Sequence, residues 1–142
     1  MVNIYEADFT LHPSEDNGKK QRRLRPVIML QFQYAEEKPI DIPALIDSGA
    51  DQSVSFQDIG EILGIKFQGE PTSPVNGITG ESNAWEKPVS VKIGNECILI
   101  NVFWINRNFD KDSDYMMALG REKIFDTFDI SFTRSKKIIF SK

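Results

Sequence analysis

The sequence predicts an all-β domain, a small β-sandwich or closed β-barrel that contains little helix. Short apolar segments recur along the chain, and clusters of Gly, Pro, Asn, Asp and Ser separate them. That pattern is typical of short strands joined by turns. With 142 residues, of which 40% are hydrophobic, the chain is long enough for one domain with a buried core. The sequence contains no internal repeat and no low-complexity tract.

The first predicted element after the N-terminal region is a β-hairpin. Residues 26–34 read Pro-Val-Ile-Met-Leu-Gln-Phe-Gln-Tyr, and the end of this segment alternates apolar and polar side chains as a half-buried strand does. Residues 35–39 form a polar turn, and residues 40–46 continue as an apolar strand. We expect the two strands to pair with each other.

Helical turns are expected at two places. Residues 56–63 predict one or two turns that end at Gly64. Residues 116–125 are short and mixed in character, and they predict one helical turn near the C-terminus. The intervening residues 69–80 are rich in Gly, Pro, Ser, Thr and Asn, which predicts a hairpin with its tip at residues 76–80.

Four further strands complete the expected domain. Residues 89–93 and 97–105 are apolar segments joined by a tight turn at Gly94-Asn95. Residues 128–132 and 137–140 predict a terminal hairpin across a polar turn.

The first 25 residues have the composition of an irregular N-terminal extension, so residues 26–142 are expected to form the domain. A turn signal at residues 14–18 precedes a cluster of basic side chains, which are Lys19, Lys20, Arg22, Arg23 and Arg25. Short runs of charge are usually solvated connections, and we favour that interpretation. The alternative is a docking patch for an acidic partner or RNA.

Composition excludes several classes of function. The net charge is −4 and the pI is about 5.0, so a nucleic-acid-binding protein is not expected. We see no membrane-spanning segment and no signal peptide, which predicts a cytoplasmic protein. The single cysteine, Cys97, cannot form an internal disulfide and is expected to be an inert core thiol. The single histidine, His12, is expected to be a surface residue, which leaves carboxylates as the best acid and base.

One segment carries an unusual carboxylate. Asp47 directly follows the apolar strand at residues 40–46, and Ser48 and Gly49 come next. A carboxylate at the end of a buried strand costs free energy unless it is paired or hydrogen-bonded. Glycine permits backbone angles and close approaches that other residues forbid, and a serine hydroxyl can hold a loop by hydrogen bonding. The segment can therefore present a carboxylate at a fixed position, although the tripeptide alone also fits an ordinary turn.

The segment resembles the active-site loop of retropepsins, the dimeric aspartic proteases that include the retroviral proteases. The match runs without a gap over Leu45-Ile46-Asp47-Ser48-Gly49-Ala50-Asp51. A second element of the family, an apolar residue before Gly-Arg, matches Ala118-Leu119-Gly120-Arg121. A glycine-containing hairpin at residues 75–80 lies between them, where the family has its flap. The three elements span most of residues 26–132.

The resemblance implies the fold and the roles of particular residues. It implies a retropepsin-like acid protease fold, a small closed β-barrel with a flap hairpin and one short helix near the C-terminus. Asp47 would be the catalytic residue, within an active-site loop that also contains Ser48, Gly49 and Ala50. Asp51 and Arg121 would form a supporting ion pair, buried beneath the loop. The flap that covers the substrate would contain Asn76, Gly77, Ile78, Thr79 and Gly80.

The chain has only one such motif, so the activity would need a second copy of the chain. A symmetric homodimer places Asp47 against its own copy, and the two carboxylates then share one proton. The expected function is an aspartic endopeptidase that cleaves a peptide or protein substrate, with no metal and no cofactor. The alternative is a dimeric module that keeps the fold and binds peptide or protein without cleaving it.

Acidic side chains alternate at residues 110–114, as they do in a calcium-binding loop. The EF-hand pattern requires glycine after the third acidic position and glutamate six residues after that glycine. Tyr115 and Arg121 occupy those positions, so a solvated acidic loop is the better interpretation.

Overall fold

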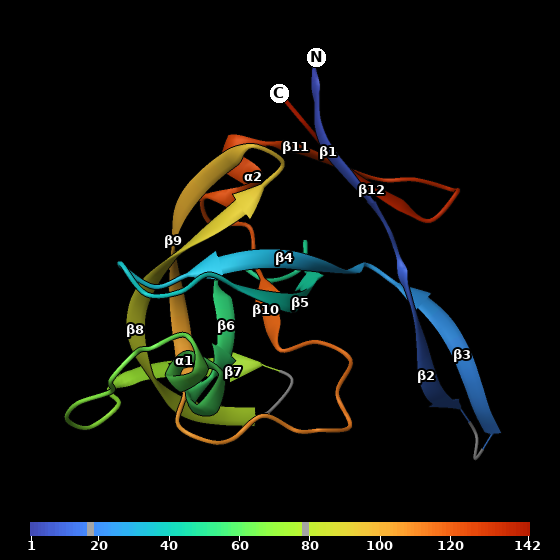
Figure 1. Ribbon diagram of the computed structural model, residues 1–142. Helices are drawn as coiled ribbons and strands as arrows, with labels where there is room; N and C mark the ends of the chain where they lie inside the picture. The colour runs from blue at the N-terminus through green and yellow to red at the C-terminus, as the bar shows by residue number, and fades with distance from the viewer. Residues whose placement is uncertain (17–18, 78–79) are drawn as a thin grey trace.

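The computed structural model describes residues 1–16, 19–77 and 80–142, without the side chains of residues 11–23 and 76–81. Predictions about the side chain of His12, most of the basic cluster, and Ile78 and Thr79 therefore lie outside the described residues. Figure 1 shows a β-barrel, a second sheet above it that contains both chain ends, and a separate two-stranded ribbon.

Most strands and both helices are short, as the sequence predicts. In chain order they are β1 (Asn3–Asp8), β2 (Thr10–Asp16), β3 (Lys19–Arg25), β4 (Val27–Gln33), β5 (Ile40–Ile46), β6 (Ser53–Phe56), α1 (Gln57–Ile62), β7 (Ser73–Gly77), β8 (Gly80–Ile93), β9 (Glu96–Ile105), β10 (Met117–Leu119), α2 (Ile124–Thr127), β11 (Asp129–Phe132) and β12 (Lys137–Ser141). The exceptions are β8, which is 14 residues long, and β9, which is 10.

The barrel closes on itself, which confirms the predicted closed β-barrel. Its strands follow the order β4-β5-β10-β6-β9-β8, and β8 pairs with β4 to complete the ring. β7 pairs with β8 outside that ring and forms the edge of the sheet. β10 runs parallel to β5 and antiparallel to β6, so it lies between two segments that are close in the sequence. Closure satisfies the backbone groups that an open edge would leave unpaired.

The barrel interior is apolar because its strands alternate inward and outward side chains. On β4, Leu30 and Phe32 are buried whereas Met29 and Gln31 are exposed. Each fully buried side chain of this kind contributes about 1.5–3 kcal/mol relative to its exposed state. Trp104 of β9 is the largest side chain in the core and has no exposed surface. Its indole N–H donates to the carbonyl oxygen of Lys87 at 3.1 Å, so its polar group is satisfied.

A three-stranded sheet in the order β1-β12-β11 packs beside the barrel. Val2 and Lys142 exchange two backbone hydrogen bonds of 2.6 and 2.9 Å, so the first and last strands lie side by side. The turn between β8 and β9 passes close beneath β1. Gly94 in that turn has φ of +62°, and a Cβ there would come within 2.6 Å of the Ile4 carbonyl oxygen. Both the conformation and the close approach require glycine.

The hairpin formed by β4 and β5, the Gly94-Asn95 turn and the terminal hairpin formed by β11 and β12 confirm their predictions. The helical turn at α1 lies where the sequence places it, and α1 ends close to Gly64, which has φ of +97°. The second prediction, a helical turn within residues 116–125, is only partly right, because residues 117–119 form β10 and α2 begins at Ile124. No helix in the described parts of the chain has the length and apolarity needed to cross a bilayer.

Two predictions are wrong. The first 25 residues are not irregular, because β1 pairs with β12 and β2 pairs with β3. β1 finds its partner at the far end of the chain, and such non-local pairing leaves little trace in local composition. Cys97 is not in the core but is exposed, since it lies opposite Lys92 on the outer face of the β8–β9 pair.

Candidate active site

Asp47 lies at the end of β5, next to the end of β10. Its backbone N–H donates to the carbonyl oxygen of Leu119 at 2.9 Å, which continues the parallel pairing of β5 and β10 by one residue. The side chain of Asp47 is half-buried, and Ser48 and Gly49 are exposed. The apolar strand therefore ends by bringing a carboxylate to the surface of the barrel.

The turn that follows fixes the carboxylate of Asp47. The backbone N–H of Gly49 donates to Asp47 Oδ1 at 3.0 Å, and the N–H of Ala50 donates to the Asp47 carbonyl oxygen at 3.3 Å. A Cβ at Gly49 would lie 3.3 Å from Asp47 Oδ1, which is closer than an ordinary van der Waals contact. Glycine at this position lets the backbone donate without crowding the carboxylate.

The loop containing Gly120 and Arg121 locks onto the loop containing Asp47. The N–H of Arg121 donates to the Ala50 carbonyl oxygen at 2.8 Å. The N–H of Gly120 donates to the buried hydroxyl of Ser53 at 3.1 Å. A Cβ at Gly120 would overlap the backbone of Gln52, so no other residue fits this contact without a backbone shift. The two sequence elements that resemble retropepsins thus meet in the structure.

The guanidinium of Arg121 donates to the carboxylate of Asp51. The family resemblance implies a buried pair, but in a single chain the two side chains are 51% and 82% exposed. An exposed ion pair contributes about 0–1 kcal/mol to stability. The backbone bonds between the two loops therefore hold them together more strongly than the ion pair does.

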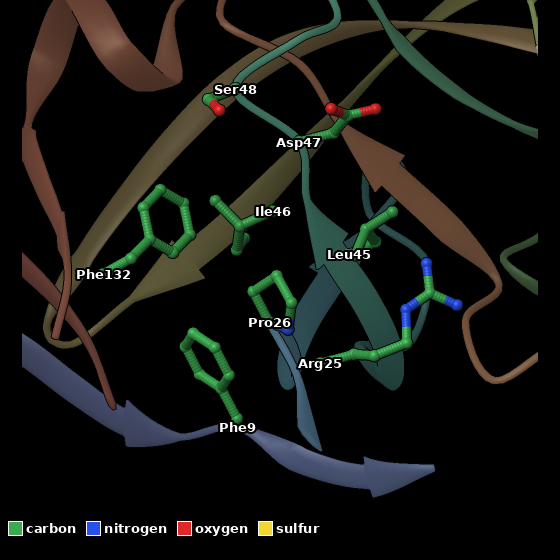
Figure 2. Close-up of a pocket in the computed structure, with 8 residues that line it drawn as sticks. All are labelled: Phe9, Arg25, Pro26, Leu45, Ile46, Asp47, Ser48 and Phe132. Carbon is green, nitrogen blue, oxygen red and sulfur yellow. The ribbon is translucent and has the colours of Figure 1, made fainter. Parts of the chain in front are cut away.

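A groove of about 540 Å³ opens beside Asp47. Figure 2 shows the rings of Phe9, Pro26 and Phe132 gathered around Ile46, with Asp47 and Ser48 at one end of the group. Phe9 and Phe132 meet edge to face with their ring centroids 6.4 Å apart, and Phe132 remains 40% exposed. The groove is thus an apolar surface with a carboxylate at one end.

A second charged group at the groove was not predicted. Arg25, which lines the groove, makes an ion pair with Asp114 at 3.1 Å between Nη1 and Oδ1, and the Asp114 side chain is only 4% exposed. The Arg25 guanidinium also lies 5.7 Å from the ring centre of Tyr115. Burial raises the pKa of the Tyr115 phenol, the nearby charges of Asp114 and Asp47 raise it further, and Arg25 opposes them. The sequence shows Arg25 only as part of a basic cluster, because its partners lie far along the chain.

The predicted flap residues belong to the ribbon formed by β7 and β8. The two strands pair antiparallel from Ser73 opposite Ala84 to Gly77 opposite Gly80. Asn76, Gly77 and Gly80 are therefore paired strand residues, and Ile78 and Thr79 are outside the described residues. Within the described part of the chain, no group of three or more His, Cys, Asp or Glu side chains is arranged to hold a metal ion.

Comparison with solved structures identifies the architecture. A retropepsin-like aspartic protease from Rickettsia conorii aligns with 99% of this chain and 96% of its own, at 16% identity and a TM-score of 0.59. EIAV protease in complex with the inhibitor HBY-793 aligns with 72% of this chain and 86% of its own, at 20% identity and a TM-score of 0.54. The retroviral protease-like domain of Ddi1 from Leishmania major covers 84% of this chain and 97% of its own, at 11% identity and a TM-score of 0.53.

These likenesses, together with the closed barrel, show that the chain has a retropepsin-like fold. No protein-family profile and no curated protein sequence matches this chain. At identities of 11–20% the structural likeness establishes the fold, whereas an activity depends on the residues around Asp47.

Proposed function

We propose that the chain is an aspartic endopeptidase that works as a homodimer through a pair of Asp47 carboxylates. The observation that supports this most directly is the placement of Asp47. Its carboxylate accepts a backbone N–H from Gly49 and lies at one end of an open apolar groove, on a barrel of retropepsin-like fold. One chain supplies one such carboxylate, and the reaction needs two.

A two-fold axis beside Asp47 would bring the second carboxylate into contact with the first. Two adjacent carboxylates repel each other when both are ionised, so the pair holds one proton and titrates as a unit. The ionised carboxylate takes a proton from water as the water attacks the peptide carbonyl carbon. The protonated carboxylate donates a hydrogen bond to the carbonyl oxygen, and proton transfer to the departing amine completes the cleavage.

The neighbouring residues have supporting roles in this proposal. Ser48 holds the two active-site loops against each other across the axis, and Gly49 and Ala50 line the path of the substrate. Asp51 and Arg121 brace the loop. In this proposal the flap residues 76–80 cover an extended peptide, and the peptide backbone pairs with the flap as an added strand.

Substitution of Asp47 by asparagine tests the proposal. Cleavage of a diverse peptide library is measured for the wild type and for Asp47→Asn from mildly acidic to neutral pH, with melting temperature and sedimentation as controls for fold and assembly. Asp41→Asn is the matched control, because Asp41 is an exposed residue of the same strand. We expect Asp47→Asn to abolish cleavage and Asp41→Asn to retain it.

Two results would overturn this assignment. Cleavage that survives in Asp47→Asn would remove that residue from the reaction. A folded, dimeric wild type that binds peptides from the library without cleaving any would instead support the non-proteolytic binding module.

A further inference from the structure

The β2–β3 ribbon is a two-stranded sheet of its own in the part of the chain that the structure describes. Its strands pair along their whole length, from Thr10 opposite Arg25 to Asp16 opposite Lys19. Among the described residues no third strand pairs with it, and Figure 1 shows it directed away from its own barrel. A two-stranded ribbon alone is marginally stable in water, so a partner surface is expected to cover it.

The root of the ribbon, where Thr10 and Arg25 join it to the rest of the chain, is held by several contacts, whereas the rest of the ribbon extends away from the barrel (Figure 1). The N–H of Phe9 donates to the Lys136 carbonyl oxygen at 2.8 Å, and the hydroxyl of Thr10 donates to the Val27 carbonyl oxygen at 2.5 Å. Arg25 at the other strand end makes the ion pair with the buried carboxylate of Asp114. The ribbon is thus anchored to both the three-stranded sheet and the barrel, which fixes the direction in which it leaves them.

The same root forms part of the groove beside Asp47. Phe9 precedes β2, Arg25 ends β3, and Pro26 follows it, and all three line that groove. If two Asp47 carboxylates meet at a two-fold axis, the second copy must lie against this groove. Each ribbon then begins where the two copies meet and extends about 23 Å beyond that point, at about 3.3 Å per residue.

Charge also favours a second copy as the partner. Between Thr10 and Arg25 there are five basic and two acidic residues, a net charge of +3. Because the whole chain carries −4, the remaining residues carry −7. A basic ribbon and an acidic body are electrostatically complementary between two copies of the same chain.

We propose that the β2–β3 ribbon is a clasp that docks on the barrel of the second copy. The inference rests on the proposed homodimer and adds an assignment for residues 10–16 and 19–25. By two-fold symmetry each copy holds the other, so two ribbons stabilise one dimer. The clasp stabilises the dimer without contributing a group to the reaction.

Removal of the ribbon is the first part of the test. Residues 11–24 are replaced by an asparagine–glycine turn that joins Thr10 to Arg25, which are already paired neighbours. The dimer Kd is measured by sedimentation velocity over a dilution series, and cleavage per dimer is measured at saturating protein concentration. We expect the Kd to rise by at least about tenfold, with cleavage per dimer unchanged.

A charge variant keeps the test independent of the deletion. Lys19, Lys20, Arg22 and Arg23 are substituted by glutamate, which should raise the Kd. Added salt should weaken the wild-type dimer by screening these charges, and it should no longer weaken the dimer of the variant. The matched control changes four exposed basic residues elsewhere on the chain to glutamate, which are Lys38, Lys66, Lys111 and Arg134. The control should change the Kd much less, although its net charge equals that of the ribbon charge variant.

The outcomes separate the clasp from the proposed function. A wild-type Kd in both ribbon variants would overturn the clasp and leave the homodimer standing. A charge variant that dimerises normally but no longer binds heparin, a polyanion probe, would assign the ribbon to an acidic partner instead. A wild type that stays monomeric at every concentration would overturn the homodimer, and the clasp with it.

Discussion

At the scale of single residues, the site depends on contacts that the local sequence shows only in part. The loop from Leu45 to Asp51 is contiguous, so its pattern of apolar strand, carboxylate and glycine can be recognised in the sequence alone. The contact between Gly120 and Ser53 joins residues 67 positions apart and cannot be read from either segment alone. The same holds for Arg25 and Asp114, which are 89 positions apart.

Tyr115 predicts an alkaline limit to stability. Its pKa is raised in the folded protein, chiefly by burial, so the unfolded chain loses the phenolic proton at lower pH than the folded chain does. The stabilisation from the neutral phenol is fully present below the ordinary pKa of about 10 and is lost as pH rises through the folded value. We expect the free energy of unfolding of the wild type to fall above about pH 10.

Urea denaturation at neutral and alkaline pH compares the wild type with Tyr115→Phe. The phenylalanine variant has no proton to lose at this position, so its stability should fall less over the same alkaline range. Equal alkaline losses in the two proteins would show that Tyr115 does not titrate differently in the folded and unfolded states.

At the scale of strands and helices, local pattern predicts hairpins of apolar strands well, but it misses the charged β2–β3 hairpin and predicts non-local strands poorly. β4 and β5 are joined by a short polar turn, and the sequence predicts both strands and their pairing. β1 and β12 pair from opposite ends of the chain, and no local signal marks that register. β10 is three residues long, and its strand character depends on its neighbours β5 and β6. Tertiary context overrides propensity in such short segments.

Met117 tests the importance of β10. Its side chain has no exposed surface, and its backbone pairs with β5 on one side and β6 on the other. We expect Met117→Ala to lower the free energy of unfolding by about 2–5 kcal/mol, because it leaves a cavity in the core. Chemical denaturation provides the measurement.

Met29→Ala is the matched control for this substitution. Met29 lies on the outer face of β4 and is 59% exposed, so its truncation should change stability by no more than about 0.5 kcal/mol. Similar losses for the two variants would mean that β10 does not close the barrel as tightly as the structure shows.

At the scale of the whole molecule, the single chain has a complete barrel but only one of the two carboxylates that the proposed reaction needs. An all-β sandwich or barrel could be predicted because strand and turn patterns recur along most of the chain, and the resemblance at the Asp47 and Gly120 segments selected the closed barrel. The groove could not, since its residues come from distant parts of the chain. The ribbon is a local hairpin, but its two strands are mostly polar and charged and lack the apolar alternation that marks a strand. The proposed homodimer follows from the single Asp47 motif, and it can be tested by mixing.

Mixing the wild type with an equal amount of Asp47→Asn should lower cleavage by more than the halving of the wild-type concentration would. If equal amounts exchange subunits randomly, about one quarter of the dimers carry two wild-type chains. Cleavage should then fall to about one quarter of that of the same total amount of wild type. Mixing with Asp41→Asn should leave the rate unchanged. A fall to one half would mean that each Asp47 acts on its own.

The exposed position of Cys97 has a practical consequence for following such exchange. It is the only thiol in the chain, and it lies on the outer face of β9, away from the residues that line the groove beside Asp47. A maleimide dye should therefore attach at one known point without disturbing the barrel. Donor-labelled and acceptor-labelled copies would then report subunit association by energy transfer, which is followed over time as acceptor fluorescence.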